Sequence, residues 1–313
     1  MPQSTLPTCA LFSRRIHVCL GRSCCATGAR QRLHRQVATL AEVAASADWN
    51  GPAKPRVIYA VEGSVGTIFL NNPAKHNALD LRGYLELPSV AAAVSSHSGV
   101  RVVVLRGHGQ TAQGLPMSFG AGSDISEFAE LRMGDEAIKR YNAAEAAAAQ
   151  ALRCIPHPTI ALIHGNCMGG GLNLALCMDV RYAADNAQFC VPPAKLGVGY
   201  PIQMMNHLVN AVGIARAKEL VYTSRVFRAQ EACDIGIVQA VAPAHALDEM
   251  VANMCANISE LAPMTMRAAK LACDDNASQA DAEAACTACY ASEDYREGVA
   301  AFLEKRKPRF LGR

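Results

Sequence analysis

The stretch GNCMGGGLNLALCMD, from Gly165 to Asp179, decides how the rest of the chain is interpreted. It follows the apolar run TIALIH (residues 159–164) and places three consecutive glycines where a helical pattern starts. Glycine loses more backbone entropy on folding than any other residue, so such a run indicates an unusual backbone conformation or a close approach to the backbone. The pattern predicts a strand, a glycine loop and a helix through Met178.

A second loop, FGAGSDISEF (residues 119–128), repeats this arrangement. It follows the apolar strand predicted at residues 100–105 and a glycine-rich loop at residues 108–122. Repeated units of strand, loop and helix build parallel sheets that helices cover. We therefore expect an α/β fold.

Hydrophobic periodicity predicts the remaining elements. The expected strands lie within residues 56–70, with a turn at residues 62–64, and at residues 179–183 and 187–191. Helical spacing covers residues 79–94 and 134–153, and the chain is mostly helical from residue 213 onward. No linker interrupts residues 56–262, so we predict one core domain at residues 55–262 and a C-terminal helical region at residues 263–313.

The first 39 residues contain six arginines and no acidic residue. This composition is typical of a mitochondrial transit peptide, although a disordered basic tail or an upstream start codon would look the same. We predict a leader at residues 1–54 and a location in the mitochondrial matrix, or otherwise the cytoplasm. The net charge of +3 gives no reason to expect a nucleic-acid partner, and no apolar stretch is long enough to span a bilayer.

Thirteen cysteines are scattered without the spacing of metal ligands. Cys286 and Cys289 form a lone CxxC, which cannot complete a structural zinc site. We expect no metal and most cysteines reduced.

The two glycine loops are the best candidates for chemistry. Each would present unpaired N–H groups at a strand-to-helix junction, where the helix dipole favours negative charge. Two such amides that converge form an oxyanion hole. A phosphate loop is the rival interpretation, but GxxxxGK[ST] is absent, as is GxGxxG after the strands. For either loop alone, glycines that only permit close helix packing are an equally good explanation.

The chain resembles the crotonase superfamily, the enoyl-CoA hydratase/isomerase group, from about Val57 to its C-terminus. The matching segments are NNPAKHNALD (71–80), FGAGSDISEF (119–128), HGNCMGGGLNLALCMDVRYAADNAQFCVPPAKLGVGYP (164–201), FRAQEACDIGIVQAV (227–241) and EGVAAFLEKRKPRF (297–310). The resemblance implies a crotonase-like spiral of ββα repeats with a helical C-terminal trimerisation region, assembled as a homotrimer or hexamer. It also implies an acyl-CoA thioester as substrate, with coenzyme A as part of that substrate and no separate cofactor.

Carried over by position, the resemblance makes the N–H groups of Ser123 and Gly170 the donors to the thioester oxygen. It places Lys75, His76 and Ala78 along the groove for coenzyme A. Lys305 and Phe310 belong to a segment near the adenine, although a solvated helix face explains Lys305 equally well. The remaining substrate-binding candidates lie in the two glycine loops: Ala121, Gly122, Ile125 and Gly169.

The chain departs from the pattern of the hydratases at two positions. Where the resemblance places two catalytic glutamates, this sequence has Asn173 and Pro193. An amide has no useful pKa and proline has no functional side chain, so neither residue is a general base.

Other groups near the two loops could act instead. Asp124 is a catalytic candidate, but Asp124 and Glu127 are explained more simply as carboxylates at a helix start. A surface lysine and a packed tyrosine are the simpler interpretations of Lys195 and Tyr200. We expect the remaining candidates to be structural, namely His164 as a core histidine and Cys167 and Cys190 as inert thiols.

The sequence thus supports an enzyme that stabilises an enolate of an acyl-CoA thioester, as an isomerase, an atypical hydratase or a decarboxylase. The alternative is a non-catalytic acyl-CoA-binding or scaffold protein of the same fold.

Overall fold

The computed structural model describes residues 54–110, 114, 118–274 and 277–313. The predicted leader lies outside these residues except for Lys54, and part of the loop predicted at residues 108–122 also lies outside them.

The larger sheet of the described chain has six strands, and five of them are parallel. The first strand, β1, pairs antiparallel with β2 through the predicted turn. The order is β1 (Val57–Glu62), β2 (Val65–Leu70), β3 (Val102–Gly107), β4 (Thr159–Ile163), β6 (Val180–Ala184) and β9 (Ala240–Ala242).

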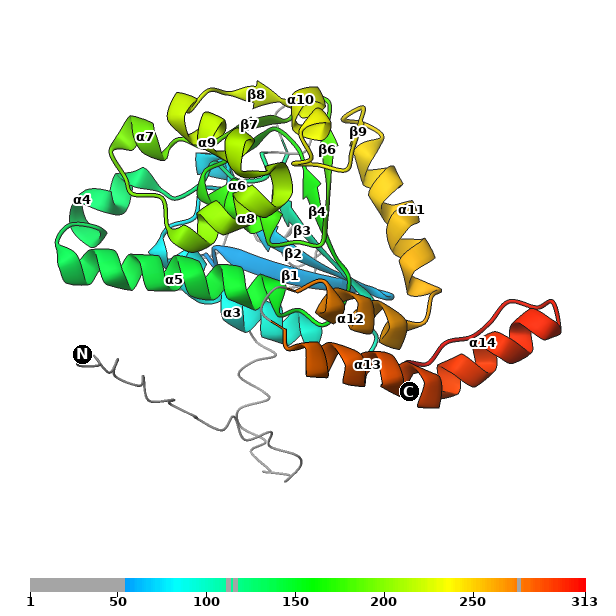
Figure 1. The fold of residues 1–313 in the computed structure, drawn as a ribbon. Helices are drawn as coiled ribbons and strands as arrows, with labels where there is room; N and C mark the ends of the chain where they lie inside the picture. The colour runs from blue at the N-terminus through cyan, green and yellow to red at the C-terminus, as the bar shows by residue number, and fades with distance from the viewer. Residues whose placement is uncertain (1–53, 111–113, 115–117, 275–276) are drawn as a thin grey trace, which may run out of the picture. The chain divides into compact units, whose positions relative to one another are not determined.

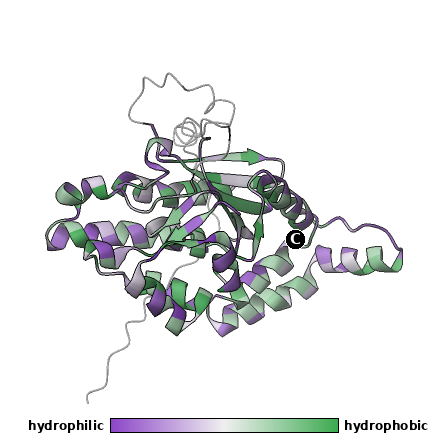
Figure 2. Ribbon diagram, turned by 90° about the horizontal axis from the view of Figure 1, so that it is seen from above, coloured by the Kyte–Doolittle hydropathy of each residue, from purple (hydrophilic) through white to green (hydrophobic). Residues whose placement is uncertain are grey.

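Helices cover both faces of this sheet (Figure 1). The helices α3 (Leu81–Ser95) and α5 (Asp135–Arg153) pack against each other on one side, and α11 (Leu247–Ser259) contacts β3, β4, β6 and β9 on the other. Alternate residues of β3 therefore enter two different apolar clusters. Because both faces are buried, the strands are apolar along most of their length, as Figure 2 shows.

A smaller sheet holds β5 (Asn166–Met168), β7 (Gln188–Cys190) and β8 (Phe227–Arg228). The strand β5 corrects the prediction that the glycine run follows the apolar strand directly. Three residues are too few for hydrophobic periodicity to reveal, and β5 forms because β7 pairs with it on one side and Gly120 bridges to it at Cys167.

The other helices confirm that the C-terminal part is mostly helical. After residue 213 these are α9 (Ile214–Thr223), α10 (Ala229–Asp234), α12 (Pro263–Ala272), α13 (Gln279–Ala291) and α14 (Glu293–Leu303), together with α11. Before it lie the helices α6 (Gly170–Leu176) and α8 (Ile202–Val212) and the short helical turns η2 (Pro73–Lys75), η3 (Ile125–Glu127), α4 (Phe128–Leu131) and α7 (Pro193–Leu196). None of the helices in the described ranges is long and apolar enough to cross a membrane.

Candidate active site

Backbone hydrogen bonds hold the two glycine loops side by side. The Gly120 N–H donates to the Asn166 carbonyl at 2.9 Å, and the Met168 N–H donates to the Gly120 carbonyl at 2.9 Å. On its other side the first loop pairs with Leu79, whose N–H donates to the Gly122 carbonyl at 2.8 Å. The loops, which are about 45 residues apart in the chain, thus form one local structure.

The glycine triplet is explained by one strained backbone position and two close contacts. Gly169, the residue before α6, has φ +49° and ψ −116°, a conformation that L side chains rarely adopt. A Cβ on Gly171 would lie 2.3 Å from the Gly120 carbonyl oxygen. A Cβ on Gly170 would lie 2.3 Å from the Tyr84 hydroxyl and 3.5 Å from the Ser123 amide nitrogen. A side chain at Gly170 or Gly171 would therefore push against the first loop or Tyr84, and one at Gly169 would strain the backbone.

Ser123 and Gly170 line the same small cavity of about 100 Å³. Gly170 is the first residue of α6, where a helix N–H has no partner within the helix. Within the described part of the chain, neither the Ser123 nor the Gly170 N–H has a hydrogen-bond acceptor. Two unpaired N–H groups beside one cavity are the donors that a polarised carbonyl oxygen requires.

Four of the other predicted binding residues, Ala121, Gly122, Ile125 and Gly169, line this cavity too, and so does Pro193. Pro193 is the first residue of α7 and contributes only a ring to the wall. Asn173 does not line this cavity. It is 1% exposed, and its Oδ1 accepts a hydrogen bond from Nδ1 of His207 at 2.8 Å.

Burial and the nearby Arg153 lower the pKa of His207 to about 4, so this imidazole is neutral at pH 7 and its Nδ1–H is available to Asn173. The Asn173 amide oxygen therefore already accepts a hydrogen bond from within the protein.

Sequence reasoning missed Glu145, which lines the cavity and is 3% exposed. It lies in the Ala-rich helix α5, where nothing in its immediate neighbours indicates a site. The available signal was its spacing, because Glu145 falls on the buried face that Tyr141, Ala148 and Leu152 form. An acidic residue on the apolar face of a helix is rarely buried without a partner.

Asp124 and Glu127 anchor the first loop. Asp124 accepts hydrogen bonds from Lys75 Nζ at 2.6 Å and from the backbone N–H of Ser126 at 3.1 Å. Burial alone would raise the pKa of Asp124, but these bonds from Lys75 and Ser126 outweigh it and lower the pKa. Glu127 accepts from the Leu81 N–H at 2.6 Å, at the start of α3. Neither carboxylate lines the cavity.

The remaining alternative catalytic groups differ in where they lie. His164 is buried and its Nε2 lies 2.8 Å from Oδ2 of Asp248 in α11. Burial raises the pKa of both the Cys167 and the Cys190 thiol, so neither is a thiolate near pH 7. Lys195 is exposed on α7, whereas Tyr200 lines the cavity.

The remaining predicted residues lie apart from the cavity. Lys75 and His76 are exposed at η2 next to the first loop, and Ala78 is buried beneath it. Lys305 follows α14, and Phe310 lines a groove between α12, α13 and α14. Within one chain the structure does not bring Lys305 or Phe310 to the two amides.

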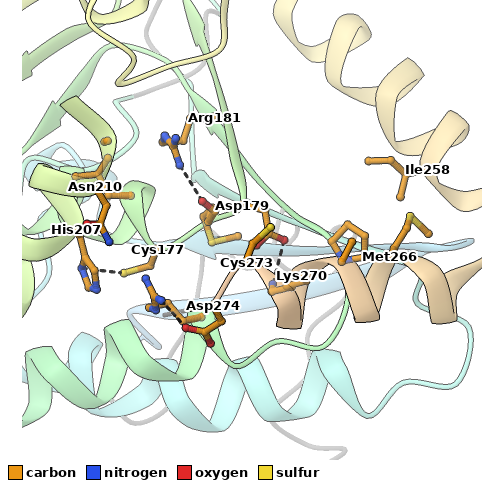
Figure 3. Close-up of a pocket in the computed structure, with 16 residues that line it drawn as sticks. Cys177, Asp179, Arg181, His207, Asn210, Ile258, Met266, Lys270, Cys273 and Asp274 are labelled. Carbon is orange, nitrogen blue, oxygen red and sulfur yellow. Dashed lines mark hydrogen bonds and ion pairs between the residues drawn. The ribbon is translucent and has the colours of Figure 1, made fainter. Parts of the chain in front are cut away.

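A larger cavity of about 590 Å³ lies beside α6, α8 and α12 (Figure 3). Its charged walls are tied together by ion pairs, including Lys270 with Asp179 at 3.0 Å and Arg153 with Asp274 at 2.8 Å. It contains neither loop amide. We therefore place the candidate site at the smaller cavity, because chemistry and not volume distinguishes it. No group of three or more potential metal ligands was found among the described residues.

Comparison with known proteins assigns the chain to a family. Residues 60–313 match the family described as enoyl-CoA hydratase/isomerase. A crotonyl-CoA hydratase from Syntrophomonas wolfei is 31% identical over 268 residues, covering 83% of this chain and all of that protein. A peroxisomal Delta(3,5)-Delta(2,4)-dienoyl-CoA isomerase from Arabidopsis thaliana is 29% identical, covering 80% of this chain and 93% of that protein.

Among solved structures, an enoyl-CoA hydratase/carnithine racemase from Magnetospirillum magneticum superposes with a TM-score of 0.77 at 33% identity, covering 83% of this chain and 97% of the other. The fold is the α/β crotonase fold with a helical C-terminal region. The chain belongs to the enoyl-CoA hydratase/isomerase family.

Proposed function

We propose that this protein is an acyl-CoA-thioester enzyme that holds the thioester oxygen between the N–H groups of Ser123 and Gly170. The observation that carries the proposal is the pair of amides without acceptors beside one cavity. Removal of a proton or of CO2 next to a thioester leaves negative charge on that oxygen, and two N–H donors stabilise the charge as it develops. Isomerisation, atypical hydration and decarboxylation all pass through this enolate.

The substrate would carry coenzyme A itself, so we propose no separate cofactor. The family relationship also supports a homotrimer or hexamer, and the basic leader supports a mitochondrial matrix location. Import of the full chain fused to a fluorescent protein would test the location. Loss of mitochondrial signal after deletion of residues 1–53 is the expected result, and an unchanged distribution would contradict it.

A non-catalytic acyl-CoA-binding protein is the second candidate. It is favoured by Asn173 and Pro193, which supply no acid or base where the resemblance places glutamates. The two candidates differ in turnover and not in binding.

The test is a turnover screen with purified protein on crotonyl-CoA, 3-hexenoyl-CoA and methylmalonyl-CoA, combined with calorimetric binding of butyryl-CoA. Turnover of any of the three is expected. Tight binding of butyryl-CoA without turnover of any thioester would contradict the enzyme proposal and support the binding protein.

A further inference from the structure

Glu145 occupies the boundary between two cavities. It lines the small cavity that holds the two loop amides, and it also lines a neighbouring cavity of about 360 Å³ between α5 and α8. Among the described residues that line the small cavity, Glu145 is the sole carboxylate. A carboxylate beside developing negative charge is in the right class of group to carry a proton.

The two oxygens of Glu145 are held in place. Oε1 accepts a hydrogen bond from the Ser123 hydroxyl at 2.8 Å, and Oε2 accepts from Nη2 of Arg132 at 3.1 Å. The Tyr84 hydroxyl lies 2.9 Å from Oγ of Ser123 and completes the chain of hydrogen bonds.

Arg132 is itself immobilised. Its guanidinium carbon lies 4.8 Å from the ring centre of Phe128 and 4.5 Å from that of Tyr141, and Nη2 donates to Asn142 at 2.8 Å. A rigid cation thus fixes the carboxylate, which limits the reorganisation that proton transfer would need.

We propose that Glu145 is the proton-transfer residue of this site and that the reaction is the isomerisation of a 3-enoyl thioester to a 2-enoyl thioester. The proposal rests on the proposed function. Its geometric basis is Ser123, whose hydroxyl donates to Glu145 and whose N–H has no acceptor among the described residues. Ser123 and Glu145 line the same small cavity, so a thioester oxygen bound at that N–H would hold its α-carbon, two bonds away, in the cavity that the carboxylate lines.

The reaction balances with one carboxylate. Glu145 removes a proton from the α-carbon, so a C–H bond breaks and an O–H bond forms on the carboxyl group. The electron pair enters a dienolate whose negative charge lies on the thioester oxygen between the two amides. The double bond then shifts, the γ-carbon takes the proton back, and the carboxylate is regenerated without an oxidant or a second substrate.

Hydration would need more than this site offers. A water molecule must be oriented and activated while a second proton is delivered to the α-carbon, which normally requires two positioned groups. Among the described residues that line the small cavity no second carboxylate is present. The side chain of Asn173 is hydrogen-bonded to His207. A proton shuttle between two carbons needs only the group that is present.

The surroundings of Glu145 also suit a base. Burial raises its pKa, and Arg132 and the Ser123 hydroxyl offset only part of that effect. The other titratable groups that face it are Tyr84 from α3, Tyr141 from α5 and Tyr200 after α7, and burial raises the pKa of each of these phenols. Across the neighbouring cavity His207 is neutral. A carboxylate with a raised pKa is a stronger base than an ordinary one.

The first experiment follows isomerisation of 3-hexenoyl-CoA by the full-length protein and its variant Glu145→Gln. The amide keeps the size of the side chain and loses its basicity, so kcat should fall by about 10²- to 10⁴-fold while KM changes little. Glu145→Asp should retain a measurable fraction of the rate. Glu136→Gln is the matched control, because Glu136 lies in the same helix with an 89% exposed side chain.

The second experiment measures how the rate of isomerisation depends on pH. A carboxylate with a purely structural role would not affect this dependence. The rate should rise with pH as Glu145 ionises, and the variant Glu145→Gln should lose this rise. Arg132→Gln removes the cation that lowers the pKa of Glu145, so the rise should move to higher pH. Thermal melting and butyryl-CoA binding would show that each variant is folded.

Exchange of the α-protons of butyryl-CoA with D2O, followed by NMR, separates the possible failures. Exchange that depends on Glu145 supports the proposal. Exchange or isomerisation that survives Glu145→Gln with an unchanged pH profile overturns the role of Glu145 but leaves the enolate-stabilising function intact. Turnover of methylmalonyl-CoA or crotonyl-CoA without exchange or isomerisation overturns the role of Glu145 alone. Wild-type protein that binds butyryl-CoA, catalyses no exchange and turns over none of the three thioesters overturns both proposals.

Discussion

Gly170 shows how a single residue connects the fold to the proposed chemistry. Its amide begins α6, and its missing side chain leaves room for the Tyr84 hydroxyl and the Ser123 loop. The same absence of a side chain would let a thioester approach the amide. Packing and the proposed function therefore both require a residue without a side chain at position 170.

Substitution at Gly170 should remove most of the activity. A Cβ would lie 2.3 Å from the Tyr84 hydroxyl, so Gly170→Ala must displace the tyrosine or the start of α6. Loss of one oxyanion donor costs about 10²- to 10³-fold in turnover, and we expect a decrease of this size in kcat for 3-hexenoyl-CoA.

The double variant Gly170→Ala with Tyr84→Phe tests this steric explanation. Removing the hydroxyl relieves the contact, so the double variant should recover part of the lost rate relative to Tyr84→Phe alone. Gly170→Ala with wild-type turnover would contradict the steric explanation, because it would show that a Cβ at this position does not displace the amide.

At the scale of elements, an ion pair and a hydrogen bond dock α11 onto the sheet. Asp248 in α11 pairs with Arg106 from β3 and with His164, which follows β4. Burial alone would raise the pKa of Asp248, but the hydrogen bonds from His164 and Arg106 outweigh it and lower the pKa to about 2 from an ordinary 3.8. His164 thus joins two layers of the fold, as expected for a core histidine.

This pairing should make stability depend on pH in a defined window. A carboxylate with a lowered pKa contributes its full stabilisation above its unfolded pKa and loses it as the pH falls through the folded pKa. For Asp248 the contribution should be complete above pH 3.8 and disappear toward pH 2. Because the side chain is 42% exposed, solvent screening keeps the contribution small.

Urea unfolding of wild-type protein and Asp248→Asn at several pH values would measure the contribution of Asp248 to stability. The variant should be less stable above pH 4, and the difference should shrink as the pH falls. Glu249→Gln, at the exposed neighbouring position of α11, is the control. A difference between wild type and Asp248→Asn that is independent of pH would contradict this account.

At the scale of the whole molecule, the C-terminal helices leave apolar side chains without cover in one chain. The C-terminal apolar surface comprises the exposed residues Tyr290, Tyr295, Val299, Phe302 and Leu303 of α13 and α14. Phe302 is 84% exposed and Leu303 is 73% exposed. Contiguous exposed apolar surface commonly marks an interface between proteins, which supports the proposed trimer or hexamer.

Light scattering at micromolar concentration should therefore give the mass of a trimer or hexamer. Phe302→Lys places a charge in the C-terminal apolar surface and should reduce the average mass. Ala284→Lys adds the same charge to an exposed position of α13 outside that surface and should leave the mass unchanged. A monomeric wild-type protein would contradict the proposed assembly.

The sequence by itself and the tertiary structure determined different parts of the fold and of the candidate site. Apolar periodicity and glycine punctuation predicted β1 to β4, α3 and α5, because these signals come from residues that are neighbours in the chain. The resemblance to the crotonase superfamily, and not a local pattern, implied that the two glycine loops meet. Tertiary structure decided that β5 precedes α6, that Asn173 accepts a hydrogen bond from His207, and that Glu145 accepts one from Ser123. Helical spacing places Glu145 on the buried face of α5, but its contact with Ser123 depends on how α5 packs against a loop some 20 residues earlier, and no local pattern records that contact.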